Sequence, residues 1–105
     1  MGEKEYLRSI RPGQDRIRYH HLTEGKRVIK FLVQYETFIE GKWREIVRYD
    51  SAHGHPHKDV LHPDGSQDKE YFQGWSNAEV LTYGQEDIRK RWTEYRQAYI
   101  REMGK

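Results

Sequence analysis

The sequence predicts an α+β fold, in which an antiparallel sheet of three to five strands carries a long C-terminal helix on one face. Two β-rich runs flank a short glycine-containing turn in the first half of the chain, and an apolar stripe at helical spacing occupies the last twenty residues. Aromatic residues make up 13% of a chain that is 34% charged. Because each buried ring removes about 150–250 Å² from water, this content favours a packed core over disorder. A length of 105 residues predicts one domain, 1–105.

The N-terminal segment, residues 1–14, is polar and ends in the turn signal Arg11-Pro12-Gly13. We expect it to be a loosely ordered basic arm. Residues 1–30 contain eight Lys or Arg against four acidic residues, a net charge of +4. Such a segment is a mild attractor of polyanions.

Alternation of apolar and polar residues predicts the strands. Residues 16–22 suit an edge strand, and residues 28–39 form the strongest strand, with one dry face. The turn Glu40-Gly41-Lys42 leads into a return strand at 43–49, and shorter strands are expected at 58–61 and 69–72. The hairpin pairs Val33 with Tyr49, Tyr35 with Val47 and Ile39 with Trp43.

The helical part begins near Ser76, where Ser76-Asn77-Ala78-Glu79 fits a capping box. We expect a short helix at 77–82, a break at Gly84 and a long helix from about 85 to 103. A stripe at spacings of three and four faces the dry side of the hairpin and comprises Ile88, Trp92, Tyr95, Tyr99 and Met103.

Composition excludes several classes of protein. The absence of cysteine excludes disulfides, a Cys-ligated zinc site and thiol catalysis. No apolar run approaches the roughly 20 residues that a membrane-spanning helix needs. The segment MGEKEYLRSI has no secretory h-region, so we expect a cytoplasmic protein without membrane association.

Histidines are concentrated after the return strand. Four of the six, His53, His55, His57 and His62, lie within ten residues. In one interpretation, His53, His55 and His57, with His62, Asp50 or Asp59, bind a divalent transition metal such as zinc. Gly54 and Pro56 between the histidines give the segment no fixed strand geometry.

A second interpretation is acid–base chemistry on RNA without a cofactor. Histidine can take or give a proton near neutral pH, so His53 and His57 are the acid/base candidates, with Tyr49 beside them. In this scheme Arg48 and Lys58 bind phosphate, and Asp50 orients a histidine.

Two further interpretations involve no chemistry at this segment. Asp50 caps the turn after the strand, Gly54 and Pro56 shape the loop, and the histidines are exposed. Alternatively, the chain is an interaction module whose exposed sheet edge pairs with a partner strand.

The segment GKWREIVRYDSAHGHPHKD resembles a group of small uncharacterised prokaryotic proteins. A strand ending in Arg48-Tyr49-Asp50, a His-containing loop and a C-terminal helix are also similar to the TumE-type toxins of prokaryotic toxin–antitoxin pairs. The resemblance covers less than half of the chain and implies a compact α+β protein, either an RNA-directed toxin with an antitoxin-like partner or a relative that has lost that activity. The longer basic N-terminus and the extra histidines His53 and His55 depart from the pattern.

Overall fold

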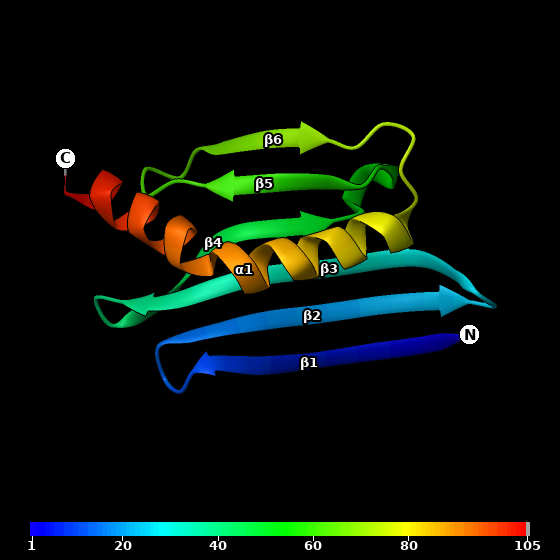
Figure 1. Ribbon diagram of the computed structural model, residues 1–105, viewed down its shortest axis with the longest axis horizontal. Coiled ribbons are helices and arrows are strands. Elements are labelled where there is room, and N and C mark those ends of the chain that lie inside the picture. Colours follow the sequence, from blue (N-terminus) through cyan, green and yellow to red (C-terminus); the bar gives the residue numbers. More distant parts are fainter. Residues whose placement is uncertain (105) are drawn as a thin grey trace.

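A six-stranded antiparallel sheet and one long helix make up the fold (Figure 1). The computed structural model describes residues 1–104, without the side chain of His53. The elements are β1 (Gly2–Arg11), β2 (Asp15–Glu24), β3 (Arg27–Ile39), β4 (Lys42–Asp50), the 3₁₀ turn η1 (Ala52–Gly54), β5 (His57–Leu61), β6 (Gln67–Tyr71) and α1 (Asn77–Met103).

The strands follow one another in space in their order along the chain, β1-β2-β3-β4-β5-β6. The α+β class is confirmed, but the sheet has one strand more than the three to five expected. The additional strand is β1, which occupies most of the segment 1–14 that was expected to be a loose arm. Its Tyr6 ring stacks on Tyr19 of β2 at a centroid distance of 4.6 Å. As an edge strand, β1 is mostly exposed and therefore lacks the apolar alternation that marks the inner strands.

The register of the central hairpin confirms two of the three expected pairs. Val33 faces Tyr49 and Tyr35 faces Val47, but Ile39 faces Lys42 rather than Trp43. A β-bulge after the Tyr35–Val47 pair shifts the register by one residue. The strands are then joined by a two-residue turn, in which Glu40 and Gly41 have φ angles of 52° and 81°. Positive φ at both positions matches the right-handed twist of a hairpin.

The helix α1 is continuous, so the expected break at Gly84 is wrong. The capping box at its start is confirmed, with Ser76 accepting from the Glu79 amide and Glu79 accepting from that of Ser76. Gly84 serves packing instead, because a Cβ atom there would lie 2.7 Å from Cγ of Tyr49. The predicted stripe is also confirmed: Ile88 and Tyr99 belong to the core, and Trp92, Tyr95 and Met103 pack against it.

One face of the sheet is covered by α1, which packs on β3 and β4 (Figure 1). Val33, Tyr35, Val47 and Tyr49 point into this layer and form the core with the helix. No other element of residues 1–104 covers the opposite face, which we call the open face. Within the same residues, no helix combines the length and apolarity that crossing a membrane requires.

Candidate functional site

Two cross-strand rows of polar side chains meet on the open face. Residues in register share a face of an antiparallel sheet, and residues two apart along a strand lie on the same side. One row pairs Asp50 of β4 with His57 of β5, and His57 with Tyr71 of β6. The next row pairs Arg48 with Asp59, and Asp59 with Lys69. These rows place opposite charges side by side on β4, β5 and the edge strand β6.

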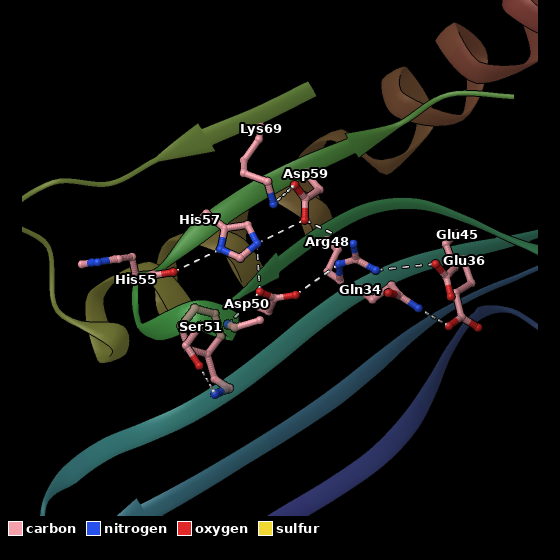
Figure 2. Close-up of polar contacts among 12 residues, drawn as sticks. Gln34, Glu36, Glu45, Arg48, Asp50, Ser51, His55, His57, Asp59 and Lys69 are labelled. Atoms are coloured by element: carbon pink, nitrogen blue, oxygen red, sulfur yellow. Dashed lines mark hydrogen bonds and ion pairs between the residues drawn. The ribbon is translucent and has the colours of Figure 1, made fainter. Parts of the chain in front are cut away.

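His57 lies between two carboxylates (Figure 2). Its Nδ1 is 3.1 Å from the backbone oxygen of His55, and this oxygen only accepts, so Nδ1 carries a proton. Its Nε2 is 3.0 Å from Oδ1 of Asp50 and 3.2 Å from Oδ2 of Asp59. The His57 residue is 2% exposed and the Asp59 residue 1%, so the group is buried. A bare nitrogen lone pair facing two carboxylates is repulsive. This arrangement therefore requires a cation at Nε2, either a proton or a metal ion.

The two carboxylates are held by Arg48 and Lys69. Arg48 contacts Asp50 through Nε at 3.1 Å and Asp59 through Nη2 at 3.2 Å, while Lys69 lies 3.0 Å from Oδ1 of Asp59. Burial acts to raise the pKa of Asp59, but hydrogen bonds from Lys69 and Arg48 and the charge of His57 outweigh it and hold this pKa below its usual range. Asp59 is therefore ionised at neutral pH and available as a ligand.

Figure 2 shows how the charged network continues toward β3. Arg48 lies 3.6 Å from Glu45, and Gln34 donates to Glu36 at 2.6 Å. Glu36 also accepts from Arg16 and Arg18 of β2, at 2.7 and 2.9 Å. Basic side chains on this part of the open face thus have acidic partners.

Asp50 lies at the boundary between this network and a surface hollow. Its Oδ1 accepts a hydrogen bond from the amide of Ala52 at 3.0 Å, which confirms that it caps the turn after β4. It also lines a hollow of about 380 Å³ on the open face, which we call the Asp50 hollow. The other residues that line it are Glu5, Arg18, His20, Lys30, Phe31, Leu32, Ser51 and Ala52.

The donor atoms fit a divalent metal ion. One ligand atom each from Asp50, His57 and Asp59 lie within 4.8 Å of one another. In a tetrahedral site, metal–ligand bonds of about 2.0–2.2 Å separate the ligand atoms by about 3.4 Å. Nε2 lies 3.0 and 3.2 Å from the two carboxylates, which is close to this spacing. A histidine that donates its other ring N–H to a carbonyl is also the usual form of a metal ligand.

Comparison with known proteins places the chain in a family. A family model described as a domain of unknown function, DUF7718, matches residues 1–105. The chain belongs to the DUF7718 family. Comparisons with curated proteins and with solved structures found no match.

The structure separates two expected site residues from His57. Tyr49 and Lys58 lie on the helix-covered face, one residue away along each strand from the open-face pair Asp50–His57. Tyr49 is fully buried and donates to Asp87 at 2.5 Å, and burial together with this bond raises its pKa well above the usual value. Lys58 donates to the hydroxyl of Tyr95 at 2.7 Å. Neither side chain is therefore placed to act on a phosphate group that binds beside His57 on the open face.

The expected histidine cluster is also dispersed. His55 contributes its backbone oxygen, and its ring points away from His57 (Figure 2). His62 lies between Asp68 and Glu102, at 2.9 and 2.8 Å, and these hydrogen bonds raise its pKa. The side chain of His53, expected as a catalytic residue or ligand, lies outside the described part of the chain. Of the four histidines, His57 alone has a described place beside Asp50 and Asp59.

Lys69 was not predicted from the sequence, and Asp59 was predicted only as one of three alternative additional metal ligands. The available signal was spacing, because Arg48 and Asp50 are two apart in one strand, and His57 and Asp59 are two apart in the next. Once the two strands pair, these four residues share a face. The register between them could not be read from the sequence, since η1 and its flanking residues set it.

Proposed function

We propose that the protein binds a divalent transition metal ion of the zinc or manganese type on the open face. Its ligands are Nε2 of His57 and one oxygen each from Asp50 and Asp59. The observation that carries the proposal is the direction of His57, whose protonated Nδ1 is engaged by a carbonyl and whose Nε2 faces two buried carboxylates. Imidazole and carboxylate together are ligands for such ions.

A proton is the competing occupant of this position. If Nε2 carries one, His57, Arg48 and Lys69 supply three positive charges against those of Asp50, Asp59 and Glu45. The network is then balanced and serves as a structural tie between β4, β5 and β6. The experiment must therefore distinguish a metal ion from a proton at the same nitrogen.

Three protein ligands leave coordination positions for water and a substrate. Structural zinc sites use four protein ligands, whereas catalytic ones use three and keep a position open. A bound ion supplies an activated water near neutral pH. Asp50 borders both the ligand set and the Asp50 hollow, so a substrate in the hollow reaches the ion from that side. The function supported best is metal-assisted hydrolysis.

The test is a titration of chelator-stripped protein with Zn²⁺ and Mn²⁺, followed by calorimetry and by nitrogen-detected NMR of the histidine rings. We expect one ion per chain, with the largest change at Nε2 of His57, where the ion replaces the proton, while Nδ1 keeps its proton before and after addition. Asp59→Asn is nearly isosteric and should weaken binding at least about tenfold, because it removes a charged ligand.

His62→Gln is the matched control, since His62 also faces two carboxylates but lies near the C-terminal end of α1. It should leave metal affinity unchanged. Saturation of the wild-type protein with no change at His57, and a His57 ring that stays protonated at both nitrogens, would overturn the proposal. Metal-induced NMR shifts centred on His55 and His62 would also overturn the proposal.

RNA binding or cleavage, expected from the sequence, stays a prediction, as does an antitoxin-like partner. Arg48, Asp50 and His57 share the open face, which supports an RNA-directed role, while Tyr49 and Lys58 lie on the other face. Incubation of a short single-stranded RNA with the protein in excess chelator tests this scheme. Cleavage that disappears in His57→Ala would favour metal-free chemistry over the metal centre.

A further inference from the structure

We propose that the Asp50 hollow binds the phosphate group of a small phosphomonoester, which the adjacent metal ion also contacts. This inference rests on the proposed metal site and adds its class of substrate. It follows from the position of the hollow, from the charges that line it and from the ion pairs on the rest of the open face.

Position links the hollow to the metal ligands. Asp50 contributes a wall of the hollow, and its Oδ1 lies 3.0 Å from Nε2 of His57. Asp59 and His57 are almost fully enclosed, with exposures of 1% and 2%, whereas Asp50 is 8% exposed. A ligand therefore approaches the proposed ion past Asp50. The volume of about 380 Å³ is near the lower end of small-molecule sites, which suits a small ligand.

The charges in the hollow suit an anion once a metal ion is present. Arg18 and Lys30 line it, together with His20, against the single further acid Glu5 among the described lining residues. Arg18 donates to Glu36 through Nε at 2.9 Å, which fixes the guanidinium while its Nη nitrogens stay available to a ligand. A guanidinium, an ammonium and a divalent ion around one space favour a dianionic phosphate.

The remainder of the open face argues for a small ligand over a long polyanion. Arg16, Arg48 and Lys69 each contact a carboxylate on this face. A nucleic acid laid across the sheet would have to compete with those acids for these three cations. A phosphomonoester needs only the hollow and the ion, and it carries two charges where a phosphodiester carries one.

Hydrolysis of this ligand class balances with water alone. The ester P–O bond breaks, the hydroxide of an activated water forms the new P–O bond, and the proton of that water goes to the leaving oxygen. The products are inorganic phosphate and an alcohol.

The experiment uses the full chain loaded with Mn²⁺ and inorganic phosphate as the probe. Mn²⁺ broadens the ³¹P resonance of any phosphate bound close to it, so the broadening in excess of that caused by free Mn²⁺ reports occupancy of the hollow. We expect saturable broadening above that of free Mn²⁺. Phenyl phosphate should compete at least about tenfold better than diphenyl phosphate or a ten-nucleotide RNA.

Lys30→Gln and Arg18→Gln should weaken phosphate binding about five- to tenfold while Mn²⁺ affinity stays the same. Lys26→Gln is the matched control, because Lys26 lies outside the lining of this hollow. Lys26→Gln should change neither the phosphate affinity nor the Mn²⁺ affinity. Lys30 is exposed, so its substitution tests the hollow without disturbing the fold.

The failures are distinguishable. Absence of Mn²⁺ binding in the wild-type protein overturns the metal site and this inference together. Mn²⁺ binding without saturable phosphate broadening overturns only the ligand class. Stronger competition by the RNA than by phenyl phosphate overturns the choice of a small monoester and indicates that the site binds nucleic acid.

Discussion

At the scale of single residues, the role of the polar cluster depends on the side chain of Asp59. It is 1% exposed, and its two oxygens contact His57, Arg48 and Lys69. Buried charges are stable only when paired, and removal of one partner leaves the others uncompensated. A group with this many charged neighbours either stabilises the junction of β4, β5 and β6 or holds an ion there.

Asp59→Asn should lower the free energy of unfolding by about 3–5 kcal/mol at neutral pH, because it breaks a buried ion network. The pKa of Asp59 is depressed in the folded protein, so its stabilising effect is present above the unfolded value of about 3.9 and is lost as the pH falls through the folded pKa. Urea unfolding in chelator from pH 7 to pH 3 checks this. The gap between wild type and variant should narrow toward acid, and a gap independent of pH would contradict the role given to this carboxylate.

At the scale of elements, Gly84 shows how a local preference is overridden by packing. Glycine in a helix interior is unfavourable by about 1 kcal/mol relative to alanine, which makes it a sensible place to expect a break. Here it lets α1 approach β4, because Tyr49 fills the space where a Cβ atom would lie. Tyr49 is buried and tied to Asp87 of α1, so it has no free direction in which to move.

Gly84→Ala should therefore destabilise the protein by about 1–3 kcal/mol, although helix propensity alone predicts a gain. Thermal unfolding by circular dichroism measures the effect. Gly104→Ala is the control, because a Cβ atom at the end of α1 meets only backbone oxygens at ordinary distances of 3.6 and 4.0 Å. A Gly84→Ala protein more stable than wild type would show that α1 does not pack as closely on Tyr49 as described.

At the scale of the whole molecule, the elements that bury aromatic and β-branched side chains were predictable from the sequence. Residues 28–39 and 43–49 alternate because one face meets α1, and the stripe from Ile88 to Met103 meets that face. The edge strand β1 was not predictable, since most of it is exposed and only a few of its side chains pack against the core, so burial imposes little apolar alternation there. The candidate site was predicted in part. Asp50 and His57 follow from the density of polar residues, but the separation of Tyr49 and Lys58 from them depends on which face each side chain takes.

The same asymmetry should govern how the molecule unfolds. The helix packs on β3 and β4, whereas β1 and β6 lie at the two edges of the sheet and are mostly exposed. Regions with few buried contacts open at lower free energy than the core. In native-state hydrogen exchange we expect the slowest amides in β3, β4 and the buried face of α1, and exchange at least about tenfold faster at the paired amides of β1 and β6. Uniform protection across all six strands would mean that the sheet opens as one unit.

Zn²⁺ or Mn²⁺ should slow exchange in β5, whose His57 and Asp59 supply ligands, and leave exchange in β1 unchanged. Slower exchange at β1 in place of β5 would place the ion elsewhere on the sheet.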